Sequence, residues 1–412
     1  MRFARVEAVH IPKGFAKRIR KGDKVLWGPY LTRYVSLGDS IAAGHTINAE
    51  WERDYGTRSQ YGENGRKETV IVPKCYTDLI RKDLAEKFGG KVSATSFARS
   101  GDKVDDLIEK LNHATVSRTI AKADYVTICI GANNVLGPTL DHIQEYFLGD
   151  GSALNAMQSE IEINLAALAD DNNPNSYTAL FNKLSAINPN AQYVFTTIYN
   201  PYKYFYLEEG SNGFFKPLLD TIPQMTILGF EVDEAIKNLL LDQAIVKRLF
   251  SRANVMCDYA EDFVARLNAV LRDKLTAYGN SNFMLADTKA LFDVVPDRPI
   301  PAEKHYNDLV NVEFTRGFDV SEMDWGQLYK GTNAGTFWTK LALKHTSFSS
   351  GLDIGGLADE LMPQVVEKVI LPDADPHPEE YGHEVLRTSF ESCYTPGFYS
   401  RINRAIAQQQ SH

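Results

Sequence analysis

Short, largely apolar runs alternate with segments of helical periodicity from residue 31 to about residue 290, and this alternation limits the fold more than any other feature of the sequence. The run Tyr125–Ile130 is apolar almost without a break. Such a run is expected for a strand of a parallel sheet that helices cover on both sides. Four further strands are predicted, at Tyr34–Leu37, Val92–Phe97, Tyr193–Ile198 and Phe283–Leu285. Strands that alternate with helices predict an α/β protein built around a parallel sheet.

Helical periodicity falls between the predicted strands. We expect helices at about 76–88, 104–111, 152–186 and 255–277. The segments 200–250 and 293–365 do not fit this rhythm. We interpret them as insertions into one domain, placed at the carboxyl ends of strands, where open α/β sheets bind ligands. The expected organisation is an N-terminal basic hairpin segment over residues 1–33 and one domain over residues 34–400.

Composition and charge disfavour several classes of protein. The 412 residues are 44% apolar and 24% charged, as in soluble globular proteins, and the net charge of −9 predicts no nucleic-acid partner. We find neither the ~18–20 apolar residues of a transmembrane segment nor the apolar core of a signal peptide. The four cysteines contain no C-x-x-C pair and predict neither a disulfide framework nor a zinc site. These features favour a cytoplasmic location, or a virion if the chain is derived from a phage.

The N-terminal segment differs in charge from the rest of the chain. Residues 1–33 carry nine basic and two acidic side chains. A hairpin is predicted over residues 14–27, with Gly22-Asp23 as its turn. Its basic face is either solvated surface or a docking site for a partner. The stretch Lys21–Trp27 resembles short modules at the front of phage tail proteins.

Nucleotide-binding, zinc-protease and α/β-hydrolase motifs are absent: the sequence has no G-x-G-x-x-G, P-loop, H-E-x-x-H or G-x-S-x-G. Four residues remain as candidates for a functional site. Ser40 follows the first strand. It is either the N-cap of a helix or a residue placed where backbone N–H groups can stabilise negative charge. Gly101 and Asn133 follow the second and third strands, where each is either a turn residue or a donor to an oxyanion. His377 lies between two prolines beside carboxylates, as a general base requires.

These blocks occur in the order typical of the SGNH, or GDSL-like, hydrolase family, which the chain resembles over about 34–200 and 366–392. The resemblance implies a flavodoxin-like, three-layer α/β/α sandwich. It also implies a serine esterase or lipase that forms an acyl-enzyme and needs no metal or cofactor. The substrate would be a small-molecule, lipid or glycan ester.

The same resemblance assigns roles to the four candidates. Ser40 is the expected nucleophile, and His377 is the expected base. The backbone N–H groups of Ser40 and Gly101, together with the Asn133 side chain, are the expected oxyanion hole.

Two positions depart from the family pattern. The third block usually ends in Asn-Asp, and Asn134 here replaces the Asp. The acid usually lies three residues before the histidine, where this chain has Ala374 between Asp373 and Asp375. The group that supports His377 is therefore Asp375, Asp373 or, in a Ser-His dyad, a backbone carbonyl near Ala374. Because Asp375 precedes a proline, extended backbone can place its carboxylate on the same side as the imidazole.

Two further segments bear on the substrate. The apolar stretch Phe230–Phe250 either covers an acyl pocket or packs on the core. The aromatic residues among Tyr199–Tyr206 either stack on sugars or fill the core. We expect a general carboxylesterase, with a carbohydrate O-acetyl esterase as the alternative. The alternative of a different class is a catalytically silent structural or binding module, for instance in a phage tail.

Overall fold

A five-stranded parallel sheet forms the centre of the fold, in the order β4-β3-β5-β6-β9. The strands are β3 (Leu31–Gly38), β4 (Lys91–Ser96), β5 (Tyr125–Cys129), β6 (Gln192–Thr196) and β9 (Phe283–Ala286). The computed structural model describes residues 20–21, 24–25, 31–45, 47, 71–88, 91–148, 152–201, 203, 226–227, 230–231, 244–293 and 377–394. All five predicted strands are present, so the prediction of a parallel α/β sheet is confirmed.

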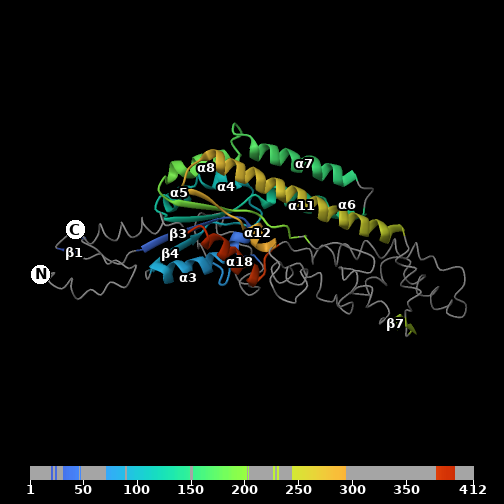
Figure 1. Cartoon of the computed structure of the whole chain (residues 1–412), viewed down its shortest axis with the longest axis horizontal. Coiled ribbons are helices and arrows are strands. Elements are labelled where there is room, and N and C mark those ends of the chain that lie inside the picture. The colour runs from blue at the N-terminus through green and yellow to red at the C-terminus, as the bar shows by residue number, and fades with distance from the viewer. Residues whose placement is uncertain are drawn as a thin grey trace, which may run out of the picture.

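Helices cover both faces of the sheet and complete three layers (Figure 1). One face carries α3 (Tyr76–Phe88), α12 (Thr288–Asp293) and α18 (Glu380–Glu391). The other face carries α4 (Val104–Lys110), α5 (Ala114–Ile120), α6 (Ala132–Leu148), α8 (Tyr177–Ile187) and α11 (Ala244–Tyr278). Helix α7 (Ser152–Ala169) packs outside α6 and α11. The prediction for α11 placed its start near residue 255, eleven residues too late.

The core lies between these layers, and two of the three inner strands, β5 and β6, are buried along their whole length. Their branched and aromatic side chains, such as Val126, Ile128 and Phe195, are almost completely withdrawn from solvent. Burying one such side chain stabilises the fold by roughly 1.5–3 kcal/mol. The apolar run that first indicated a covered parallel sheet therefore lies at the centre of the molecule.

Helix α6 was not predicted, and its sequence contains Gly137 and Pro138, two residue types that are unfavourable inside helices. Proline has no N–H, so the carbonyl of Asn134, four residues earlier, loses its usual helical donor. The side-chain amide of Asn164 on α7 donates to this carbonyl at 2.7 Å instead. This hydrogen bond between helices offsets the missing one and allows α6 to continue through the proline.

The strand order places a ligand-binding crevice at one edge of the sheet. From β3 the chain moves outward to β4, whereas from β5 it moves to β6 on the other side. Open α/β sheets bind ligands where the strand order reverses in this way, outside the carboxyl ends of the strands. The loops after β3, β4 and β5 all begin at this edge.

The N-terminal segment contains a short antiparallel pair, β1 (Arg20–Lys21) and β2 (Lys24–Val25), which agrees with the predicted hairpin. A second pair, β7 (Thr226–Ile227) and β8 (Phe230–Glu231), falls within the predicted insertion at 200–250. Most of that insertion and all of 294–365 lie outside the described residues, so the domain boundaries stay predictions. None of the described helices has the length and apolar character needed to cross a membrane.

Replacing Gly38 by alanine should destabilise the protein. The residue has φ +143°, and a Cβ there would lie 2.0 Å from the carbonyl oxygen of Cys129. We expect the free energy of unfolding to fall by ~2–5 kcal/mol, from backbone strain and overlap together. In the matched variant Gly137→Ala, the nearest atom to the new Cβ is 3.8 Å away, and the change should stay within about 1 kcal/mol. Equal losses in urea unfolding of the two variants would contradict this account.

Candidate active site

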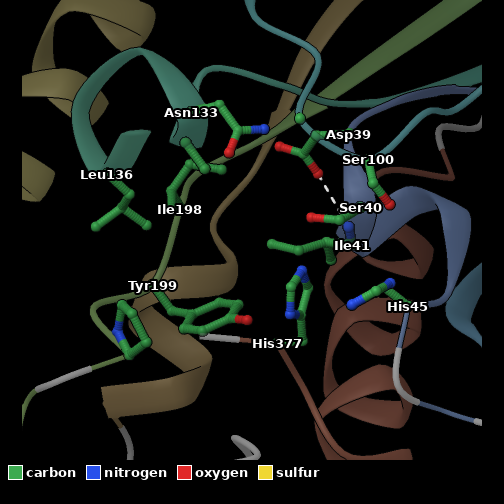
Figure 2. Close-up of a pocket in the computed structure, with 13 residues that line it drawn as sticks. Asp39, Ser40, Ile41, His45, Ser100, Asn133, Leu136, Ile198, Tyr199 and His377 are labelled. Atoms are coloured by element: carbon green, nitrogen blue, oxygen red, sulfur yellow. Dashed lines mark hydrogen bonds between the residues drawn. The ribbon is translucent and has the colours of Figure 1, made fainter. Parts of the chain in front are cut away.

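A pocket of about 180 Å³ lies at the carboxyl edge of the sheet (Figure 2). The structure brings four of the predicted site residues together in its wall: Ser40, Gly101, Asn133 and His377. The first three follow the strands β3, β4 and β5, and His377 lies three residues before the start of α18. The two candidate acids, Asp373 and Asp375, lie outside the described residues.

Ser40 is the first residue of α1 (Ser40–Ala43), a single helical turn after β3. The N-cap of this turn is Asp39, whose Oδ1 accepts the N–H of Ile41 at 3.0 Å. The backbone N–H of Asp39 donates to the carbonyl of Cys129 at 3.0 Å, which fixes the turn to β5. Since Asp39 caps the turn, the interpretation of Ser40 as an N-cap serine is wrong, and its hydroxyl is not needed for that role.

Gly101 lies in the loop after β4 and needs to be glycine because of its backbone conformation. Its φ is +84°, which side-chain-bearing residues rarely adopt, whereas a Cβ there would meet no atom within 4 Å. The same loop is tied to β3, because the N–H of Arg99 donates to the carbonyl of Gly38 at 2.9 Å. The Gly101 backbone is thereby held beside the turn that carries Ser40.

The Asn133 amide is oriented by a hydrogen bond to the loop that contains Gly101. Its Nδ2 donates to the carbonyl of Asp102 at 3.0 Å. A side-chain amide nitrogen carries two N–H groups, so a second donor remains for a ligand. The Asp102 side chain is buried and forms an ion pair with Lys110. Burial raises the pKa of the Asp102 carboxyl and lowers the pKa of the Lys110 ammonium.

Asn134, which departs from the family pattern, has a structural role. Its side chain is buried, and Oδ1 accepts the N–H of Val104 at 3.1 Å. Val104 is the first residue of α4, so this bond satisfies one of the unpaired N–H groups at the helix start. An asparagine oxygen fills this role as well as an aspartate oxygen, which explains how the substitution is accommodated.

His377 lies in the pocket wall close to a second histidine that sequence reasoning left without a role. The imidazoles of His377 and His45 have ring centroids 4.4 Å apart. In Figure 2 the His377 ring lies next to Ser40, between His45 and Tyr199. The only sequence signal for His45 is its place five residues after Ser40, at the end of the α1 turn.

His383, the other histidine of the C-terminal block, is a neutral core residue. It is fully buried in α18, and its Nδ1 accepts the backbone N–H of Tyr76 at 3.1 Å. Burial lowers the pKa of His383 to about 3, and the nearby His377 adds to this shift. His383 is therefore a buried helix residue rather than a group of the pocket wall.

The remaining wall is largely apolar and includes Leu136 and Ile198. Tyr199 also lines the pocket, and its ring stacks on Phe292 of α12 at 4.3 Å between centroids. One face of this ring is therefore covered by protein. The other predicted wall elements, in Phe230–Phe250 and at 202 and 204–206, have no described side chains.

The sequence matches a known family model. The model for GDSL-like Lipase/Acylhydrolase matches residues 34–313, about two thirds of the chain, so the chain belongs to this family of ester hydrolases. The predicted family and fold are thus confirmed. The matched range ends before His377, so the place of that residue in the site depends on the pocket geometry.

Several solved structures are similar in layout. An extracellular lipase from Streptomyces rimosus is 17% identical with a TM-score of 0.38, covering 63% of this chain and 82% of that chain. A phospholipase A1 from Streptomyces albidoflavus is 16% identical with a TM-score of 0.37, covering 63% and 81%. An acetyl xylan esterase from Geobacillus stearothermophilus is 14% identical with a TM-score of 0.30, covering 64% and 78%. Among curated proteins, none matches the sequence.

No three His, Cys, Asp or Glu side chains among the described residues are grouped so that they could hold a metal ion. The expectation that the activity needs no metal stays a prediction.

The capping role of Asn134 can be tested with two substitutions. Asn134→Ala leaves the buried N–H of Val104 without its acceptor and should lower the free energy of unfolding by ~1–3 kcal/mol. Asn134→Asp keeps an acceptor oxygen at a helix N-terminus and should stay within about 1 kcal/mol of the wild type. Urea unfolding measures both values. A loss in the Asp variant as large as in the Ala variant would show that the oxygen acceptor is not the important feature.

Proposed function

We propose that this protein is a serine carboxylic ester hydrolase that acts through an acyl-enzyme. The observation that carries the proposal is the meeting of Ser40, Gly101, Asn133 and His377 in the wall of one pocket. A nucleophile, a base and two kinds of oxyanion donor are the groups that acyl transfer requires. Membership of the GDSL-like family supports the same reaction class.

In the first step Ser40 Oγ attacks the ester carbonyl while His377 accepts its proton. The carbonyl oxygen becomes negatively charged and is stabilised by the N–H groups of Ser40 and Gly101 and by the free amide N–H of Asn133. His377 then protonates the leaving alcohol, and an acyl-Ser40 ester remains. Water attacks this ester with His377 again as base, which releases the acid and restores Ser40.

The imidazolium that forms on His377 needs a partner for its second nitrogen. We propose Asp375 first, Asp373 second and a backbone carbonyl near Ala374 third. The argument for Asp375 is the extended backbone imposed by the following proline, because residues two apart in extended chain share a side.

The pocket supports a carboxylic ester with an apolar acyl group over a sugar acetate. Leu136 and Ile198 offer an apolar wall, which an acyl chain can contact. The aromatic ring of Tyr199, which would be the platform for a sugar, has one of its two faces covered by Phe292. We propose in addition that residues 34–400 form the catalytic domain and that residues 1–33 are separable from the chemistry.

The nucleophile can be identified by covalent labelling and turnover. A fluorophosphonate probe should label Ser40, and Ser40→Ala should lose labelling together with most hydrolysis of para-nitrophenyl esters, a loss of up to ~10⁶-fold. Ser100→Ala is the matched control, because Ser100 lines the same pocket but has no role in the proposed step. Labelling of Ser100 instead would overturn the assignment of Ser40 as the nucleophile. A folded wild-type protein without turnover above the Ser40→Ala level would favour a catalytically silent module.

The supporting group of His377 can be found by comparing Asp375→Asn with Asp373→Asn on one substrate at one pH. Loss of a true triad acid misorients the imidazole and lowers kcat by up to ~10⁴-fold. We expect that loss in the Asp375 variant and a small effect in the Asp373 variant. The reverse result would transfer the role to Asp373, and small effects in both would indicate the Ser-His dyad.

A further inference from the structure

Asp39 is a buried carboxyl group in the pocket wall that the proposed mechanism does not use. Asp39 as a whole is 1% exposed to solvent. Oδ1 accepts the N–H of Ile41, whereas Oδ2 is buried and has no hydrogen-bond partner among the described residues. In Figure 2 the carboxyl lies between the Asn133 amide and Ser40. Burying an ionised carboxylate with one oxygen unpaired costs free energy, so such a carboxyl group tends to bind a proton and become neutral.

The surroundings of Asp39 do not compensate for this burial. The titratable groups that interact with it are Tyr76 of α3, Cys129 of β5, Tyr177 of α8, Asp102 of the β4–α4 loop and His377. Burial raises the pKa values of the two phenols and the thiol, so these groups are neutral. A negative charge on Asp102 disfavours ionisation of Asp39, and a positive charge on His377 favours it. Burial is the largest effect and raises the pKa of Asp39 to about 7.

We propose that Asp39 is a positioning residue that acts in its protonated form and keeps the oxyanion site free of opposing negative charge. The inference rests on the proposed hydrolase function. The tetrahedral intermediate places its negative charge near the N–H of Ser40, the residue next to Asp39. In a poorly solvated site, a carboxylate this close would repel the oxyanion strongly, whereas a neutral carboxyl would not. Ionisation of Asp39 as the pH rises therefore switches the oxyanion site off.

The charge state of Asp39 can be measured without any substrate. The ordinary pKa of an aspartate is 3.8 and the folded-state pKa is higher, so the native state binds an extra proton between these values. The wild type consequently loses stability as the pH rises through this window. Asparagine carries no proton that titrates in this range, so the Tm of Asp39→Asn relative to the wild type should increase from pH 5 to about pH 7 and level off above it.

Asp78→Asn is the matched control for burial. Asp78 is 5% exposed, but it is paired with Arg81 and Lys82, and its pKa is lowered. The Tm difference of this variant from the wild type should therefore stay constant from pH 5 to pH 8. A constant difference for Asp39→Asn as well would show that Asp39 is ionised throughout, and would overturn the inference.

The pH profile of kcat/KM on a para-nitrophenyl ester tests the consequence for the reaction. Wild-type kcat/KM should fall about tenfold per pH unit once Asp39 ionises, and Asp39→Asn should keep its activity without this decline. A folded Asp39→Asn protein that loses more than about 100-fold at every pH would overturn the inference, because the carboxylate itself would then be needed. Absence of wild-type turnover would count against the proposed hydrolase, and the Tm comparison would still decide the charge state.

Discussion

Two hydrogen bonds of the peptide group between Gly38 and Asp39 tie three strand ends together, and the geometry of the candidate site depends on them. The Gly38 carbonyl accepts the N–H of Arg99 from the loop after β4, at 2.9 Å. The N–H of Asp39 donates to the carbonyl of Cys129 in β5, at 3.0 Å. The end of β3 can approach the Cys129 carbonyl this closely because Gly38 has no side chain. Three loops that are far apart in the sequence are thereby held at one edge of the sheet, and the candidate oxyanion donors are placed together.

Much of this arrangement follows from sequence patterns. The run Tyr125–Ile130 predicts a covered parallel strand, and the parallel direction of all strands places their carboxyl ends at one edge. Polar residues that follow successive strands must then be neighbours. Ser40, Gly101 and Asn133 are neighbours for this reason, whatever their chemical role. The resemblance to the GDSL-like family was also visible in the sequence, because the motifs that contain these residues occur in the family's order along the chain.

Other features depend on contacts between segments that no local pattern reveals. Where α6 continues through Pro138, Asn164 on a different helix supplies the donor that the proline lacks. The residues around His45 in the sequence form no motif that indicates a role for it. Its ring lies against His377 only in the folded protein. The capping role of Asp39 is visible locally, but its unpaired second oxygen is a property of the surrounding core.

We propose above all that the Ser40 and Gly101 N–H groups and the Asn133 amide hold the negatively charged carbonyl oxygen of an ester that Ser40 has attacked. The most direct measurement is a crystal structure of the protein after reaction with a phosphonate ester, whose tetrahedral phosphorus resembles the intermediate. The account predicts phosphorus bonded to Ser40 Oγ, with its oxygen about 2.7–3.1 Å from all three donors. A phosphoryl oxygen that points to solvent, or an adduct on a different residue, would contradict the account.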